Sequence, residues 1–150
     1  QKVMTMAGSR YVLIEFSHNS EESYIRERLS ALLSGGYKPI MAHIERYEAT
    51  RNSLDFVEEL ADMGVYMQIN ADSITGKDGF LTKRYCNKIM KDGLLHFVGS
   101  DCHNSAKRSS RIGEAYRMVS AKFGQDYADE LFIHNPAEIL KQKQKHEAID

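Results

Sequence analysis

The stretch from Leu94 to Asn104 joins a short apolar run to side chains that can bind metal or transfer protons. The run Leu94–Val98 has the length of a buried strand, and Gly99 ends it just before Asp101 and His103. A carboxylate and an imidazole at this spacing can bind one divalent cation or two adjacent ones. The same residues also fit a solvated loop in which Asp101 caps a helix, so this motif needs support from elsewhere in the chain.

Alternating strand and helix patterns provide the elements that would position this loop. Four apolar segments predict strands, at 11–16, 38–42, 65–69 and 94–98. Each is followed by an amphipathic stretch that ends at a glycine, and the first of these helices is expected to begin at an Asn19 cap. Four such alternations predict one α/β domain over residues 1–150, with a parallel sheet and right-handed crossovers.

Polar residues stand at the carboxyl end of each predicted strand. They are Glu15, His43, Asn70, and Asp101 with His103. Because parallel neighbours bring these ends to one rim of the sheet, the side chains are expected to lie close together. Two imidazoles and two carboxylates then form a plausible oxygen and nitrogen site for a divalent metal. Glu15 alone also fits a rim position that faces water.

Composition excludes several classes of protein. The chain has 150 residues, 42% of them hydrophobic, which is enough for a real core. Lys and Arg number 20 against 21 Asp and Glu, so no overall field attracts nucleic acid or an anionic membrane, and an anionic ligand must be held by a local cluster. The two cysteines, Cys86 and Cys102, do not form a disulfide framework, which favours a reducing compartment. No apolar segment reaches the length of a membrane span, so a cytoplasmic protein is expected.

Four motifs together resemble a known family. They read Tyr-Val-Leu-Ile-Glu15-Phe, Ala-His43-Ile-Glu-Arg46-Tyr, Gln-Ile-Asn70-Ala-Asp-Ser, and Gly-Ser-Asp101-Cys-His103-Asn104 followed by Arg108. Their order and spacing resemble those of the polymerase-and-histidinol-phosphatase (PHP) superfamily, and most closely its bacterial capsule-biosynthesis tyrosine-phosphatase branch. The likeness runs from about Tyr11 to Leu140.

This resemblance implies a partial PHP-type distorted β/α barrel, similar to a TIM barrel, with a cluster of divalent metal ions. Manganese is the expected metal, with iron, zinc and magnesium as alternatives. The implied reaction is hydrolysis of phosphotyrosine on a bacterial tyrosine kinase that controls polysaccharide export. The roles implied are metal binding by Glu15, His43, Asp101 and His103, phosphate binding by Arg46, Arg108 and Asn104, and catalysis by Arg46, Arg108 and Asp101.

One departure from the family concerns the beginning of the chain. The family has a His-x-His motif and further ligands ahead of its central glutamate, and this chain has no counterpart before Glu15. The chain is therefore expected to be the C-terminal portion of such a barrel, with doubtful activity alone. The strand at 11–16 would then have a free edge, which predicts a homodimer through that edge.

Two other functions remain open from the sequence. Cys102 and Arg108 match the Cys-x5-Arg signature of thiol-dependent tyrosine phosphatases, in which a thiolate attacks phosphorus. The loop between them contains no glycine that would let backbone amides converge on a phosphate. The third function is a non-catalytic interaction module. His18, His96 and His134 are expected to be structural or to face solvent.

Overall fold

The computed structural model describes residues 2–6, 8–100 and 105–141, except for the side chains of residues 105 and 108. Its strands are β1 (Lys2–Thr5), β2 (Tyr11–Glu15), β3 (Lys38–Met41), β4 (Tyr66–Asn70) and β5 (Phe97–Gly99). Its longer helices are α1 (Glu22–Ser34), α3 (Leu54–Met63), α5 (Phe80–Lys91) and α6 (Ser105–Phe123). Its shorter ones are η1 (Ile44–Arg46), α2 (Glu48–Arg51), α4 (Ala71–Thr75), α7 (Gln125–Asp129) and the π-helical η2 (Glu130–His134).

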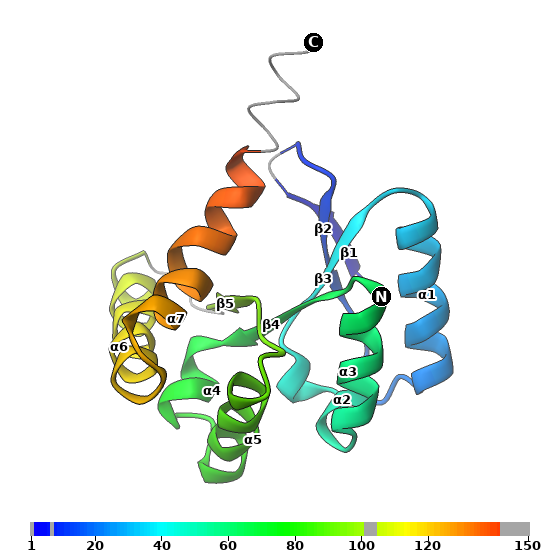
Figure 1. Cartoon of the computed structure of the whole chain (residues 1–150). Helices are drawn as coiled ribbons and strands as arrows, with labels where there is room; N and C mark the ends of the chain where they lie inside the picture. Colours follow the sequence, from blue (N-terminus) through cyan, green and yellow to red (C-terminus); the bar gives the residue numbers. More distant parts are fainter. Residues whose placement is uncertain (1, 7, 101–104, 142–150) are drawn as a thin grey trace.

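The five strands form one sheet in the order β1-β2-β3-β4-β5. The pairs β2–β3, β3–β4 and β4–β5 are parallel, as the alternating pattern predicts. The helices surround this sheet, with α1 and α3 on one flank and α6 and α7 on the other (Figure 1). None of the helices in the described part of the chain is long and apolar enough to cross a bilayer.

Both faces of β2, β3 and β4 are largely buried, which explains why these strands read as nearly continuous apolar runs. Alternate residues of β2 enter different clusters, with Ile14 in the larger core and Tyr11 in a smaller one. The larger core lies between the sheet and its helices. The smaller one includes Ile40, Phe97 and Ile139, so the C-terminal helical segment packs on the opposite face.

The first residues of the chain form a strand that the sequence did not predict. β1 pairs with β2 in antiparallel register, with Val3 opposite Ile14, and a turn closed by the Ser9 amide and hydroxyl on Met6 O joins the two strands. The free edge expected for residues 11–16 is therefore wrong, because β1 covers it. Dimerisation through that edge loses its structural basis, and β1 itself is exposed along its whole length.

Helix boundaries differ from expectation at both ends of the chain. Helix α1 begins at Glu22 without a side-chain cap, because residues 17–20 form a turn in which Ser20 N donates to Ser17 O. It ends as predicted at Gly35 and Gly36, and the latter has φ of 83°. Near the C-terminus, α7, η2 and residues 135–141 form one continuous helical segment, which passes through Asn135 and Pro136 without a break.

His96 ties three elements together, in agreement with its expected structural role. The Met67 amide donates to His96 Nδ1 at 3.0 Å, and the His96 amide donates to Met67 O at 3.0 Å. The Asn135 side chain donates to His96 O at 2.8 Å. Nδ1 is thus an acceptor, so the proton of the neutral ring lies on Nε2. Burial lowers the pKa of the His96 imidazole below its ordinary value.

We therefore expect His96 to make stability depend on pH. Below the unfolded-state pKa of about 6.5, the His96 imidazole is protonated in the unfolded chain but binds a proton less readily in the native one. The free energy of unfolding should fall as the pH drops from 7 towards 5, by roughly 1.4 kcal/mol for each unit by which the native pKa is depressed. His96→Asn keeps an acceptor for the Met67 amide and should flatten this slope in urea titrations.

His134→Asn is the matched control, because His134 is exposed. An unchanged slope in His96→Asn, or an equal change in His134→Asn, would contradict the assignment.

Candidate functional site

The ends of β2 and β3 bring Glu15 and His43 together. Ile14 pairs with Met41 across the two strands, and the Ala42 amide donates to Ile14 O at 3.0 Å. Glu15 follows Ile14 directly, His43 lies two residues beyond Met41, and Glu15 Oε1 and His43 Nε2 are 3.5 Å apart. The sequence prediction that these two side chains meet at the rim is therefore correct. The Glu15 side chain is 43% exposed, whereas that of His43 is 16% exposed.

His43 has a backbone conformation that favours glycine. Its φ of 36° and ψ of 63° are left-handed, and it is the one non-glycine among the described residues with positive φ. Such strain persists where the surrounding structure holds it and is common at functional sites. It turns the chain sharply out of β3 into η1, and places the imidazole against the Tyr47 ring, with 5.3 Å between ring centres.

Glu15 and His43 are spaced as two ligands of one cation would be. Two ligand atoms that each lie about 2.1 Å from one tetrahedral cation are separated by roughly 3.4 Å. The observed 3.5 Å between Glu15 Oε1 and His43 Nε2 agrees with that spacing. His43 Nδ1 is buried and has no hydrogen-bond partner among the described residues, which is costly for a polar atom. An oxygen and nitrogen donor pair suits manganese, iron or zinc.

Two ligands do not complete such a site. Within the described ranges 2–6, 8–100 and 105–141, no group of three or more His, Cys, Asp or Glu side chains is placed to hold a metal. The other expected ligands, Asp101 and His103, lie outside the described residues, as do Asn104 and Cys102. The side chain of Arg108 is also outside them, although its backbone lies in α6.

Three side chains, two from α2 and one from the loop after β2, hold the turn after His43 in place. Each of the three successive carbonyls of η1 accepts a hydrogen bond from a different side chain. The contacts are Thr50 Oγ1 to Ile44 O at 2.5 Å, Arg51 Nη1 to Glu45 O at 3.2 Å, and His18 Nδ1 to Arg46 O at 2.6 Å. Because a carbonyl can only accept, Nδ1 of His18 carries the proton. The turn is thereby held at every residue.

Glu45 is a buried carboxylate for which the sequence predicts no role. It is 3% exposed, and its Oε2 accepts a hydrogen bond from the backbone amide of Asn70 at 3.0 Å. Glu45 thus joins η1 to the end of β4, where Asn70 was expected at the rim. Burial raises the pKa of the Glu45 carboxyl, and the Asn70 amide opposes that shift. The sequence contains one indication that Glu45 is buried, because it directly follows Ile44 in a motif between apolar segments.

Arg46 offers a guanidinium beside this rim. Its side chain is 45% exposed, and Nη2 lies 3.8 Å from Asp78 Oδ2. Asp78 is in turn oriented by the Ser73 hydroxyl, which donates to Oδ2 at 2.9 Å. An exposed ion pair at this distance contributes little energy, so a doubly charged phosphate can compete with Asp78 for Arg46.

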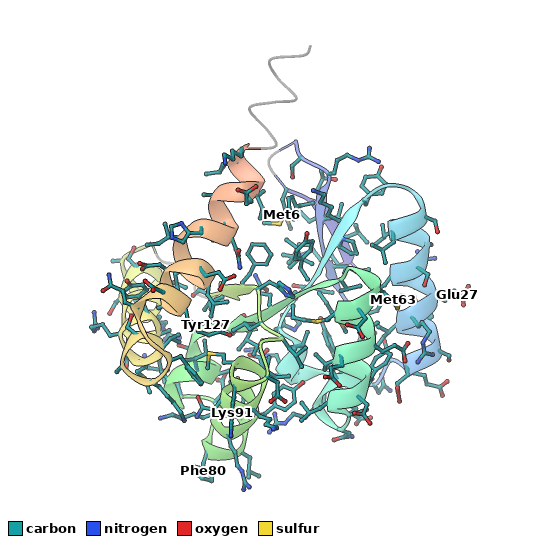
Figure 2. The ribbon with its side chains drawn as sticks, viewed as in Figure 1. Met6, Glu27, Met63, Phe80, Lys91 and Tyr127 are labelled. Atoms are coloured by element: carbon teal, nitrogen blue, oxygen red, sulfur yellow. The ribbon has the colours of Figure 1, made fainter. Side chains whose placement is uncertain are left out.

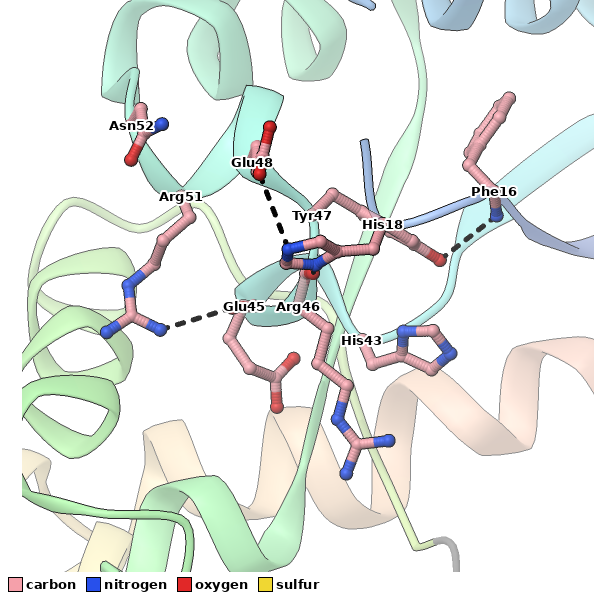
Figure 3. A pocket seen from close by; sticks show the side chains of 9 residues that line it. All are labelled: Phe16, His18, His43, Glu45, Arg46, Tyr47, Glu48, Arg51 and Asn52. Atoms are coloured by element: carbon pink, nitrogen blue, oxygen red, sulfur yellow. Dashed lines mark hydrogen bonds and ion pairs between the residues drawn. The ribbon is translucent and has the colours of Figure 1, made fainter. Parts of the chain in front are cut away.

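These side chains border a pocket of about 480 Å³. Its lining residues come from the end of β2 and from the segment that follows β3: Phe16, His18, His43, Glu45, Arg46, Tyr47, Glu48, Arg51 and Asn52. Figure 3 shows His43 and Arg46 projecting from the same turn, with the Phe16 ring pointing away from both. The Phe16 amide donates to the Tyr47 hydroxyl at 3.3 Å, and the two rings meet edge to face. Aromatic walls next to a guanidinium suit an aryl phosphate.

His18 makes more contacts than the sequence predicts. Besides its bond to Arg46 O, its Nε2 lies 3.5 Å from Glu48 Oε1, and the Glu48 amide donates to His18 O at 3.0 Å. The loop after β2 is thus fastened to the loop after β3. Cys86, by contrast, is a buried thiol whose pKa is raised by burial, so it is not suited to be a nucleophile.

Comparison with known proteins gives relatives of one kind. The chain matches, over residues 1–141, the family described as "Capsular polysaccharide synthesis, CpsB/CapC". Tyrosine-protein phosphatase CpsB of Streptococcus agalactiae is 36% identical over 146 residues, which are 94% of this chain and 60% of the relative. Tyrosine-protein phosphatase YwqE of Bacillus subtilis is 28% identical over 144 residues, which are 96% of this chain and 56% of the relative.

The fold agrees with these matches. A solved structure from work on YwqE of Bacillus subtilis and CpsB of Streptococcus pneumoniae, described as unique metal-dependent tyrosine phosphatases, superposes with a TM-score of 0.80 at 29% identity. The superposition covers 89% of this chain and 54% of that chain. This chain spans about 60% of the length of the CpsB relative. The match over residues 1–141 shows that the chain belongs to the CpsB/CapC family of capsular polysaccharide synthesis.

Proposed function

We propose that the site at the ends of β2 and β3 serves metal-dependent hydrolysis of phosphotyrosine on a protein substrate. The observation that carries this proposal is the pairing of Glu15 and His43 beside the partly exposed guanidinium of Arg46, in a pocket that Phe16 and Tyr47 help to line. It is supported by relatives that are named tyrosine-protein phosphatases, one of them with a structure described as metal-dependent. The substrate we propose is a bacterial tyrosine kinase that controls capsule or exopolysaccharide synthesis, in the cytoplasm.

The proposed metal ligands are Glu15, His43, Asp101 and His103, and the proposed metal is manganese. We also propose that this chain is the C-terminal portion of a PHP-type barrel, so that further ligands come from another segment or another copy. When bound, divalent cations neutralise phosphoryl charge and make a hydroxide nucleophile accessible near neutral pH. Glu15 supplies a hard oxygen donor, and the constrained backbone of His43 aims its imidazole at the same position.

Arg46, Arg108 and Asn104 would bind the phosphate, and Asp101 would act with them in catalysis. The Arg46 guanidinium can hold two phosphoryl oxygens with parallel hydrogen bonds, which orients the phosphorus for in-line attack. Phe16 and Tyr47 belong to the core and border the pocket, so the phenyl ring of the substrate would lie against a partly apolar lining. Arg46 is the last residue of η1 and His43 is its N-cap, so one short, well-held segment sets their separation.

For this site, the first prediction concerns metal binding and turnover. Calorimetric titration with Mn²⁺ should show binding to the chain, and Glu15→Gln or His43→Asn should weaken it at least about tenfold, because each variant removes a ligand. Hydrolysis of a phosphotyrosine peptide should require Mn²⁺ and stop with chelator, whereas Cys102→Ser should be tolerated. Turnover that survives chelation and disappears in Cys102→Ser would instead establish the thiol-dependent mechanism.

The second prediction concerns Arg46. Arg46→Lys keeps the charge but loses the bidentate fork, and should lower kcat/KM for a phosphotyrosine peptide by roughly 30-fold or more, which corresponds to a loss of about 2 kcal/mol. Mn²⁺ affinity should be unchanged. Arg28→Lys is the control, because Arg28 is exposed on α1. Equal kcat/KM for Arg46→Lys and the control would remove Arg46 from the site.

The third prediction assigns His18 as a positioning residue that acts through Arg46. His18→Leu removes the donor to Arg46 O and should lower kcat/KM by about tenfold, whereas His18→Asn places an amide donor near the Nδ1 position and should restore most of the activity. Mn²⁺ affinity, measured by calorimetry, should be the same in both variants. If the two variants are equally impaired, the hydrogen bond is not the cause.

A further inference from the structure

A groove lies between α5 and the C-terminal end of α6, separate from the pocket at the strand ends. It consists of two adjoining hollows of about 710 Å³ and 260 Å³. The hollows share part of their lining, since Asn87, Lys122 and Phe123 border both of them. The wider hollow exceeds the 480 Å³ of the pocket beside Arg46. Figure 2 shows Lys91 projecting from α5 on this side of the molecule.

The groove is bordered by positive charge. The cations that line it are Lys83, Arg84, Lys88, Lys91 and Lys122. Arg84, Lys88 and Lys91 follow one another at spacings of four and three residues, so they share one face of α5 over about 10 Å. Lys88 pairs with Asp92 at 3.3 Å, which leaves most of the charge uncompensated by that contact. This positive edge belongs to a chain whose formal net charge is −1.

The floor of the groove is apolar. Met90 and Val119 are 3% and 1% exposed, and Met118 and Phe123 complete the surface between the two helices. Lys122 Nζ lies 5.8 Å from the centre of the Phe123 ring, so the aromatic floor and the cationic edge are in contact. The flexible side chains of Met90 and Met118 can adapt to apolar residues of different shapes. The groove therefore offers both an apolar trough and charges above it.

We propose that this groove docks an acidic, amphipathic segment of a partner protein. Apolar side chains of the segment would enter the trough between Met90 and Phe123, while its carboxylates meet the cations along α5 and at Lys122. Charge complementarity selects an acidic occupant. A lipid surface fits less well, because a flat bilayer cannot reach a recessed floor. Nucleic acid fits less well too, because a stripe of about 10 Å spans only a few phosphates.

The test uses the chain and a fluorescein-labelled helical peptide of Glu, Leu and Ala, followed by fluorescence anisotropy at low and high salt. The peptide should bind, and binding should weaken with salt. Arg84→Glu combined with Lys91→Glu should reduce affinity at least about tenfold, since two edge charges become repulsive. A peptide with the same charge but Ser in place of Leu should bind much more weakly.

The control variant combines Lys2→Glu with Arg117→Glu, which makes the same change in net charge at exposed positions outside the groove. It should retain the affinity of the unmodified chain. Equal loss in both double variants would show that total charge alone attracts the peptide, and equal binding of the Ser peptide would show that the floor is unused. Tighter association with phosphatidylserine vesicles than with the peptide would assign the surface to a membrane. Each of these results overturns the proposal.

Discussion

Parallel pairing of β2 with β3 and of β3 with β4 is the constraint on which the site depends. It places the ends of these strands at one edge, so that Glu15 and His43 meet although 28 positions separate their numbers in the sequence. Because both faces of these three strands are largely buried, a slip of one residue would move a whole set of apolar side chains to the wrong cluster. The packing of the core therefore sets the position of the chemistry at the rim.

Beyond the strands, side chains replace secondary structure as the source of rigidity. The turn η1 is only three residues long, and its carbonyls are held by Thr50, Arg51 and His18. Glu45 adds a fourth contact through the Asn70 amide, at the cost of burying a carboxylate. Each hydrogen bond contributes only about 1 kcal/mol net, but leaving a buried partner unsatisfied costs more. Together they fix the short segment that carries His43 and Arg46.

The parts of this architecture that follow from periodicity were predictable from the sequence. Alternating apolar and amphipathic segments gave the parallel order, and polar residues at strand ends gave the contact of Glu15 with His43. Strand β1 was missed because its four residues are all exposed and carry no burial pattern. Glu45 and His18 were missed because their roles come from contacts with Asn70 and Arg46, which only tertiary structure brings near.

The backbone of His43 has a consequence for how this family changes over evolutionary time. A left-handed conformation costs an L-residue with a side chain roughly 1–2 kcal/mol, and glycine or asparagine would relieve most of it. Drift alone should therefore erode histidine at this position, and only selection for its imidazole would keep it. A descendant that had lost the chemistry but kept the fold would become more stable by replacing it. Histidine at position 43 is thus expected in lineages that still use the site, and glycine or asparagine in lineages that do not.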